Sequence, residues 1–222
     1  MPAAGSGQRM GGVKKPFLEL AGIPVLQRAL VPFLADDRVV AIAVALAPQD
    51  AHDPPAWLTG LDRRVRVVEG GATRTESVRR ALAALPEDLD VIAVHDAARP
   101  FVTPSVVRRC FDLAATGIGA VAGTPATDTI KHVDGEGNVI DTPARETLWH
   151  AQTPQAFPAG ALRRAYREDG PGGTDDSALV EAIGLEIRMV DAGPRNSKIT
   201  HRDDVALGEA MLAAAPEPAA RG

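Results

Sequence analysis

The sequence predicts an α/β protein with a doubly wound, mainly parallel sheet, because short apolar runs alternate with segments of helical spacing. The runs are rich in valine and isoleucine, which is typical of buried strands. Alternating strands and helices indicate βαβ units, which place parallel strands in one sheet with helices on its faces. The expected strands are 39–46, 65–68, 91–94 and 118–122, and the expected helices are 25–34, 75–85 and 104–115.

The alternation stops between residues 125 and 155. The stretch 134–138 has the composition of a hairpin turn and predicts a protruding β-arm over about 125–150. Beyond the arm we expect helices at 159–167, 176–183 and 202–214, and a strand at 186–190. Residues 1–215 are expected to form a single domain, and residues 216–222 a disordered tail.

Composition and charge exclude several classes of function. The chain has 222 residues, of which 45% are hydrophobic, so it can bury one substantial core. A net charge of −5 argues against a nucleic-acid partner. The single cysteine, Cys110, excludes an internal disulfide and favours a reducing compartment. No apolar window approaches the roughly 20 residues of a membrane span, and no signal peptide is evident, so we expect a cytoplasmic protein without membrane contact.

The N-terminal stretch 2–10 is rich in glycine and is followed by Lys14 and Lys15. Glycine lets backbone N–H groups approach phosphate oxygens, and Arg9 with one lysine offsets the charge that builds on an α-phosphate during attack. The stretch therefore indicates a triphosphate site. Taken alone, a flexible tail explains it better, because it lacks the third glycine of the dinucleotide motif and the Gly-Lys-Ser/Thr ending of a P-loop.

A pair of glycines also precedes the helix expected at 75–85. Gly71 would let the backbone lie against a flat base, and Ser77 in the first helical turn could form a hydrogen bond with that base. The plain alternative is an ordinary turn between strand and helix, with Thr73 or Thr75 as the helix cap. The stretch 69–78 predicts a base pocket only in combination with the other motifs.

The stretch 94–100 follows an expected strand and carries His95, Asp96 and Arg99. An aspartate at the carboxyl end of a strand, beside a triphosphate, suits Mg²⁺, which takes carboxylate, phosphate and water oxygens. Arg99 would face an anionic acceptor, whereas His95 is expected to be a packed histidine and not a general base. The alternative is that Asp96 caps the next turn and Arg99 is a surface charge.

Two further groups of residues add hydroxyls and cations. They are the arm with its following segment (128–131 and 145–155) and the stretches 173–176 and 196–200. Arginine forms bidentate contacts with phosphate and lysine acts as a point charge, so both groups suit a phosphate-bearing acceptor. Solvated basic side chains would explain each stretch singly, but five such motifs in one chain favour a shared site.

With these motifs, the chain resembles the 2-C-methyl-D-erythritol 4-phosphate cytidylyltransferases of the non-mevalonate isoprenoid pathway. The resemblance extends from residue 2 to about residue 211. It rests on four motifs in the family's order: Pro-Ala-Ala-Gly-Ser-Gly-x-Arg-Met, His-Asp-Ala-Ala-Arg-Pro, Trp-His-Ala-Gln-Thr-Pro-Gln and Lys-Ile-Thr. It implies a Rossmann-like nucleotidyltransferase that transfers CMP from CTP to methylerythritol phosphate and releases pyrophosphate, with Mg²⁺ as cofactor.

The resemblance also implies roles for individual residues. Residues that would bind the nucleotide are Ala3, Ala4, Gly5, Ser6, Gly7, Gly71 and Ser77. Residues that would bind methylerythritol phosphate are Arg99, Thr129, Arg145, Thr153, Thr174 and Lys198. Arg9 and Lys15 would stabilise the transition state, and Asp96 would serve the Mg²⁺ site. Arg145 and Lys198 would be catalytic as well. The residue matching Arg145 reaches the neighbouring subunit's site in this family, which implies a homodimer with arm exchange.

The implied mechanism is an in-line attack by a phosphate oxygen of the acceptor on the α-phosphorus of CTP. No covalent enzyme intermediate is required. A substrate phosphate is already ionised near neutral pH, so catalysis needs no general base and rests on alignment and charge neutralisation.

The chain departs from the family's pattern at two places near its N-terminus. Where relatives commonly have Pro-Lys, this chain has Lys14-Lys15-Pro16; Lys15 is matched because the next hydrophobic pair then falls in register, and Lys14 is the alternative. The family also has an apolar strand before Pro-Ala-Ala-Gly. We therefore expect that the first central strand is missing, that the chain is poorly stable as written, and that the native chain extends upstream of Met1. N-terminal sequencing of the protein from its own cell would test this.

Three other functions stay open at this point. A ribitol-5-phosphate cytidylyltransferase would share the nucleotide half, but His-Asp-Ala-Ala-Arg-Pro and the segment around Trp149 favour methylerythritol phosphate. A catalytically silent nucleotide-binding subunit would fit a missing strand, but the joint presence of Arg9, Lys15, Asp96 and Arg145 argues against it. A dinucleotide-dependent oxidoreductase is disfavoured by the incomplete glycine pattern.

Overall fold

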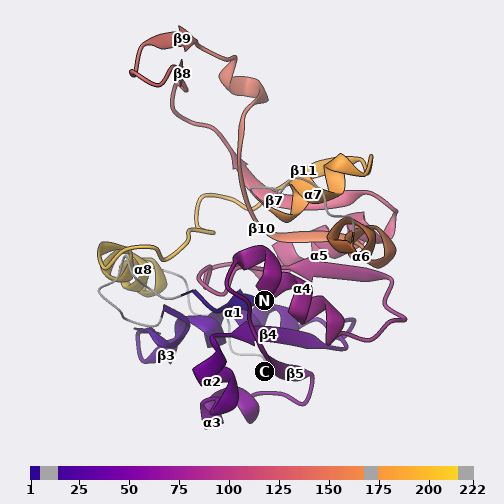
Figure 1. The fold of residues 1–222 in the computed structure, drawn as a ribbon. Helices are drawn as coiled ribbons and strands as arrows, with labels where there is room; N and C mark the ends of the chain where they lie inside the picture. The colour runs from indigo at the N-terminus through magenta and orange to yellow at the C-terminus, as the bar shows by residue number, and fades with distance from the viewer. Residues whose placement is uncertain (6–14, 168–174, 215–222) are drawn as a thin grey trace, which may run out of the picture. The chain divides into compact units, whose positions relative to one another are not determined.

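A computed structural model describes residues 1–5, 15–167 and 175–214 of the chain (Figure 1). Contacts group the chain into two compact units. The first comprises Met1–Glu87, His95–Pro104 and Arg195–Gly222, and the second comprises Asp88–Val94 and Ser105–Pro194. The single domain expected over 1–215 stays a prediction, and the tail 216–222 lies outside the described residues. None of the helices in the described ranges has the length and apolar character of a membrane span.

The first unit is built on a parallel sheet with the strand order β1-β4-β5. The strands are β1 (Pro2–Ala3), β4 (Ile42–Leu46) and β5 (Val65–Glu69). The central strand β4 is buried at every residue and packs against helix α4 (Arg74–Ala83). β4 and β5 confirm the strands expected at 39–46 and 65–68. β1 has only two residues, and the missing longer strand stays a prediction.

Small side chains bring α4 close to this sheet. Ala43 and Ala45 of β4 form one buried cluster with Ala81 of α4, and Val68 of β5 packs against it. Because alanine has a single side-chain carbon, the helix axis can approach the strands closely. These alanines therefore allow close packing between α4 and β4.

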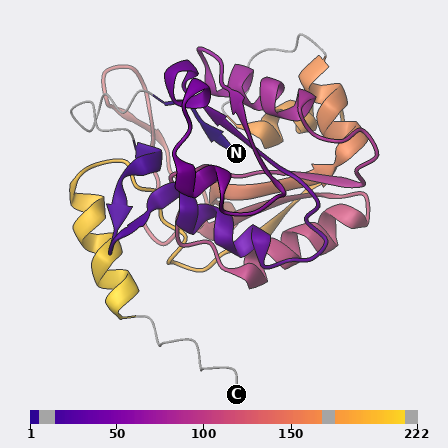
Figure 2. The ribbon, with the colours of Figure 1, turned by 90° about the horizontal axis from the view of Figure 1, so that it is seen from below.

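The remaining elements of the first unit lie outside the sheet. They are η2 (Lys15–Phe17), β2 (Glu19–Leu20), β3 (Ile23–Pro24), α1 (Val25–Leu34), α2 (Pro48–His52), α3 (Ala56–Thr59) and α8 (Asp203–Ala213). β2 and β3 form a hairpin through positive φ angles at Ala21 and Gly22. Helix α8 lies beside this hairpin (Figures 1 and 2), where Leu20, Val25 and Ile199 share a core cluster. The helices expected at 25–34 and 202–214 are confirmed.

The second unit contains a mixed sheet with the strand order β11-β7-β10-β6. Its strands are β6 (Val91–Val94), β7 (Gly119–Pro125), β10 (Trp149–Pro158) and β11 (Ile187–Asp191), and its helices are α5 (Pro104–Ala115), α6 (Ala159–Arg167) and α7 (Asp176–Ala182). β11 is parallel to β7, whereas β10 is antiparallel to both β6 and β7. The predicted parallel arrangement therefore holds for β6, β7 and β11, and the sheet is mixed because the unpredicted antiparallel strand β10 lies between β7 and β6.

Among the residues that the structure describes, Phe157 is the largest fully buried side chain. It lies on β10, and its backbone is paired with Ile92 of β6. Its ring fills the space beside Gly119 of β7: a Cβ on that glycine would lie 3.0 Å from the ring and 2.3 Å from Ile187. A side chain at position 119 would therefore have to displace Ile187 or the Phe157 ring, which packs tightly against this glycine.

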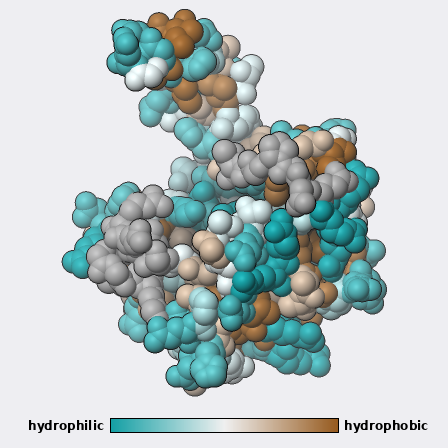
Figure 3. Space-filling model, in the orientation of Figure 1, coloured by the Kyte–Doolittle hydropathy of each residue, from teal (hydrophilic) through white to brown (hydrophobic). Residues whose placement is uncertain are grey.

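A hairpin between β7 and β10 forms the predicted arm segment. Its strands are β8 (His132–Val133) and β9 (Val139–Asp141), which pair antiparallel and are followed by η3 (Arg145–Thr147). Asp134 stabilises the turn, since its Oδ1 accepts the backbone N–H groups of Glu136 and Asn138 at 2.9 Å. The hairpin extends away from the sheet of its unit (Figure 1) and exposes apolar side chains (Figure 3), among them Val133, Val139 and Ile140. The hairpin turn expected at 134–138 is confirmed.

Candidate functional site

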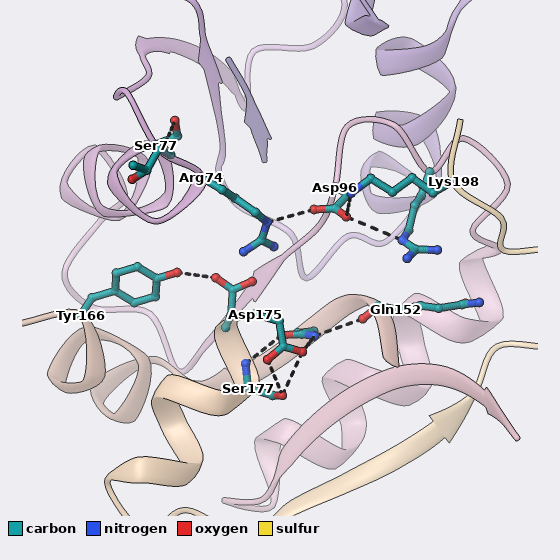
Figure 4. A network of polar contacts seen from close by, with 12 residues as sticks. Arg74, Ser77, Asp96, Gln152, Tyr166, Asp175, Ser177 and Lys198 are labelled. Atoms are coloured by element: carbon teal, nitrogen blue, oxygen red, sulfur yellow. Dashed lines mark hydrogen bonds and ion pairs between the residues drawn. The ribbon is translucent and has the colours of Figure 1, made fainter. Parts of the chain in front are cut away.

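Three cationic side chains surround the carboxylate of Asp96 (Figure 4). Lys198 Nζ donates to Oδ2 at 2.8 Å, Arg74 Nε donates to Oδ1 at 3.3 Å, and Arg99 Nε lies 3.8 Å from Oδ2. Burial alone would raise the pKa of Asp96, but the attraction of Lys198 and Arg74 outweighs it and lowers the pKa to about 2. These four residues, called the Asp96 cluster below, all belong to the first unit and keep the carboxylate ionised.

The cluster unites three residues predicted from sequence and one that was missed. Asp96 and Arg99 come from one motif, and Lys198 lies 102 residues from Asp96 along the chain. Arg74 stood in the glycine-pair stretch without an assigned role. The available signal was its place as the first residue of α4, directly after the cap, but an arginine there is more often a solvated surface charge.

The guanidinium of Arg99 has one hydrogen bond to the backbone and one donor without a partner in the described part of the chain. Its Nη1 donates to the carbonyl oxygen of Asn196 at 2.9 Å, whereas its buried Nε has no hydrogen-bond partner among the described residues. Burial lowers the pKa of Arg99. An unmatched buried donor next to other cations is suited to an anionic ligand.

His95 contacts the backbone of Arg99 and is not suited to act as a base. Its Nε2 lies 3.1 Å from the carbonyl oxygen of Arg99, which can only accept, so Nε2 carries the proton. Its ring packs against Phe33 with centroids 5.0 Å apart. Burial lowers the pKa of His95 to about 4, so the ring is neutral near pH 7. The prediction of a packed, hydrogen-bonded histidine is confirmed.

Asp96 fits the predicted role of magnesium ligand poorly. Its two carboxylate oxygens already accept from Lys198 and Arg74, and a divalent cation there would stand beside three positive side chains. In the described part of the chain, no three His, Cys, Asp or Glu side chains are grouped so that they could hold a metal ion. The contacts of Asp96 are those of a counter-ion.

The turn between β5 and α4 is ordered by three side chains. The Gly71 N–H donates to Ser77 Oγ at 3.0 Å, and that hydroxyl donates to the carbonyl oxygen of Thr73 at 2.9 Å. Thr73 caps the helix, since its Oγ1 accepts the N–H of Glu76, while the Glu76 carboxylate accepts the N–H of Ala72 at 2.8 Å. Of the two caps that the alternative interpretation allowed, Thr73 and Thr75, the structure shows Thr73, and Ser77 fixes the turn that contains Gly71.

Gly70, which the sequence analysis did not single out, lies where two elements touch. A Cβ on Gly70 would lie 2.5 Å from the Ala4 Cβ and 3.0 Å from both Leu46 O and Ser77 Oγ. Its N–H donates to the Leu46 carbonyl oxygen at 2.7 Å. The absent side chain lets the turn at 70–77 lie directly against the residues that follow β1.

The glycine-rich opening is described only in part. Ala3 is buried in β1, Ala4 is half-buried and Gly5 is exposed. Lys15 begins η2, and the role of its side chain stays a prediction. The predicted site residues outside the described ranges are Ser6, Gly7, Arg9 and Thr174, together with the alternative lysine, Lys14.

The remaining predicted residues lie in the second unit. Thr129 and Arg145 are exposed near the base of the hairpin, and Arg145 Nη1 donates to the Thr127 carbonyl oxygen at 2.9 Å. Thr153 is buried in β10. Arg145 is thus bound to the backbone two residues before Thr129, whereas Thr153 lies in the sheet.

A buried polar network of the second unit was not predicted. The Gln155 amide donates to Asp175 Oδ2 at 2.7 Å and accepts the backbone N–H of Ser177 at 2.9 Å. Asp175 caps α7 and accepts from the Ser177 hydroxyl at 3.0 Å. The network fixes the start of α7 against β10, so Gln155 of the Trp-His-Ala-Gln-Thr-Pro-Gln motif has a structural role.

Comparison with known proteins gives a consistent result. A family model described as 2-C-methyl-D-erythritol 4-phosphate cytidylyltransferase matches residues 1–214. The protein of that name from Parasynechococcus marenigrum is 41% identical over 95% of both chains. Its counterpart from Symbiobacterium thermophilum is 43% identical over 96% of this chain and 91% of its own. A crystal structure from Thermus thermophilus, also of a 2-C-methyl-D-erythritol 4-phosphate cytidylyltransferase, has a TM-score of 0.78 at 34% identity and covers 95% of this chain and 96% of its own.

Proposed function

Because the chain belongs to the 2-C-methyl-D-erythritol 4-phosphate cytidylyltransferase family, we propose that the Asp96 cluster and the glycines of the first unit form its catalytic site. The protein is a cytidylyltransferase, which transfers CMP from CTP to 2-C-methyl-D-erythritol 4-phosphate in isoprenoid biosynthesis. The observation that carries this function is the family match over residues 1–214. The charge of the cluster supports it, because three cations against one carboxylate leave two positive charges for an anionic acceptor.

In the proposed reaction, a phosphate oxygen of the acceptor attacks the α-phosphorus of CTP in line with the leaving pyrophosphate. The P–O bond to the β-phosphate breaks, and its electron pair leaves with pyrophosphate. Lys198 and Arg99 hold the acceptor through its negative charge, and Arg9 and Lys15 offset the charge on the α-phosphate. The neutral, buried His95 agrees with a reaction that needs no general base.

The nucleotide half of the site is proposed to lie where the turn at 70–77 meets the residues after β1. Ala3, Ala4 and Gly5 offer backbone N–H groups to the phosphates, and Gly71 and Ser77 form the edge of the base pocket. Mg²⁺ is proposed to enter with the phosphates of CTP, which provide the oxygen ligands that it prefers. Asp96 then acts as the counter-ion of the acceptor-binding cations.

Four further residues are proposed to bind the acceptor: Thr129, Arg145, Thr153 and Thr174. A homodimer in which the hairpin arm serves the neighbouring copy would use the exposed Arg145. The exposed apolar residues Val139 and Ile140 support such a contact, since large exposed apolar groups mark interaction surfaces. Light scattering is expected to give twice the chain mass of 23.2 kDa, and a value of one chain mass would contradict the dimer. We further propose a cytoplasmic location, which cell fractionation tests.

A pyrophosphate-release assay with purified protein tests the function. We expect release with CTP, Mg²⁺ and 2-C-methyl-D-erythritol 4-phosphate together, and none when either substrate is left out. An assay with ribitol 5-phosphate in place of 2-C-methyl-D-erythritol 4-phosphate distinguishes this function from that of a ribitol-5-phosphate cytidylyltransferase. A folded protein that releases no pyrophosphate with either acceptor would contradict the proposal.

Replacing Gly70 with alanine is expected to raise KM for CTP by about tenfold or more, since the added Cβ would overlap Ala4 and push the turn away from β1. KM for the acceptor is expected to change much less. Steady-state kinetics with each substrate varied in turn measures both constants. Gly160→Ala is the matched control, because a Cβ there meets nothing within 4 Å. Equal KM values for CTP in the two variants would contradict the predicted contact.

A further inference from the structure

We propose that Arg74 is a positioning residue: by holding one oxygen of Asp96, it prevents that carboxylate from neutralising Lys198, whose charge then remains available to the acceptor. The inference rests on the proposed assignment of Lys198 to the acceptor. The geometry divides the carboxylate between two cations, with Arg74 Nε on Oδ1 at 3.3 Å and Lys198 Nζ on Oδ2 at 2.8 Å. Oδ1 can therefore contact Lys198 only if its hydrogen bond with Arg74 is broken.

The local structure fixes the direction of the Arg74 side chain. Arg74 is the first residue of α4, and the Thr73 cap and the Ser77 hydroxyl hold the backbone on both sides of it. Its guanidinium points toward Asp96, and Lys198 approaches the same carboxylate from the other side (Figure 4). The cap at the start of α4 thus fixes the backbone from which the Arg74 side chain extends.

Burial makes the contact stronger than an ordinary surface ion pair. The Asp96 side chain is only 12% exposed, whereas those of Arg74 and Lys198 are 34% and 40% exposed. The carboxylate thus lies in a partly shielded place, where charges interact more strongly than in water. The side chains of both cations reach the surface, where a charged substrate can meet them.

A charge balance indicates what the loss of Arg74 would do. Without it, the cluster would keep one excess positive charge where it now has two, and Asp96 would interact more strongly with Lys198 and Arg99. Lys198 would be held more tightly as an internal ion pair. The acceptor phosphate would then compete with Asp96 for the same ammonium group, so acceptor binding would weaken while CTP binding would not.

The kinetic test uses Arg74→Gln, Asp96→Asn and the double variant, with Arg79→Gln, exposed on the same helix, as control. Arg74→Gln is expected to raise KM for the acceptor by about tenfold, a change that corresponds to one broken charge contact, and to leave KM for CTP within about twofold. If Arg74 acts through Asp96, the double variant is expected to match Asp96→Asn within about twofold. Arg74→Lys should restore part of the loss. Effects of the two substitutions that multiply fully, or wild-type constants in Arg74→Gln, would overturn the inference.

A substrate-free test separates this inference from the proposed function. Limited acetylation of the intact protein, followed by mass spectrometry of the peptide with Lys198, measures how tightly the ammonium group is held. We expect acetylation of Lys198 about threefold slower in Arg74→Gln than in the wild type, and no difference between Asp96→Asn and the double variant. An unchanged or faster rate in Arg74→Gln refutes the inference even if the protein turns over both substrates. Conversely, the expected rates together with an inactive wild type would refute only the function.

Discussion

Replacement of Lys198 with alanine is expected to lower kcat/KM for 2-C-methyl-D-erythritol 4-phosphate by about a hundredfold or more, which is typical for loss of one charged contact to a reacting phosphate. The substitution removes the cation closest to Asp96, at 2.8 Å, and leaves one excess positive charge in the cluster. Binding of CTP is expected to persist, because the proposed nucleotide contacts lie on the other elements of the unit. Steady-state assays with each substrate varied in turn measure both effects.

Arg188 provides a matched control for this substitution. Its side chain is 58% exposed and pairs with Glu186 on the surface of β11, so Arg188→Ala is expected to leave both kinetic constants within about twofold. Thermal unfolding of both variants should show that neither loses its fold. If Lys198→Ala retained the wild-type kcat/KM for the acceptor, the assignment of the Asp96 cluster to acceptor binding would be wrong.

The second large effect is on stability. Phe157→Ala is expected to lower the free energy of unfolding by about 3–5 kcal/mol, because it leaves a cavity beside Gly119 at the centre of the mixed sheet. A chain of this size loses about 2–4 °C of melting temperature for each kcal/mol, so a decrease of about 10 °C is expected. Circular dichroism during heating measures it.

A smaller change at the same position tests whether lost volume causes the lower stability. Phe157→Leu removes less volume and keeps the site apolar, so it should cost less than half as much as the alanine variant. Melting temperatures within about 2 °C of the wild type for both variants would contradict a tightly packed core around Phe157.

Strands made of continuous apolar residues could be predicted from the sequence, and β10 could not. β4 and β6 are continuous runs of valine, isoleucine, leucine and alanine, so composition alone indicates them. β10 begins with Trp-His-Ala-Gln-Thr-Pro, a mixed polar run with a proline, and its pairing with β7 shifts register between Ala151 and Gln155. Neither the apolar period of a strand nor a simple alternation is present there, so the antiparallel strand stayed hidden.

The site shows the same limit at the level of single residues. Asp96, Arg99 and Lys198 lie in motifs with unusual residue types, so the sequence indicates each of them, and the structure brings them together. Arg74 has no such signal, because its importance depends on the direction that the Thr73 cap gives to its side chain. The role of Asp96 as a counter-ion likewise depends on Arg74 and Lys198, which lie 22 and 102 residues from it along the chain, so no local pattern contains it.

The alanines below α4 connect the composition of the core with the chemistry of the site. Ala43, Ala45 and Ala81 determine the height of the helix above the sheet, and Arg74 stands at the end of that helix. A valine at any of these positions would place two extra methyl groups between helix and sheet. It would tilt the helix and move the guanidinium of Arg74 away from Asp96. Directed evolution of acceptor selectivity could therefore start from residues that never touch a substrate.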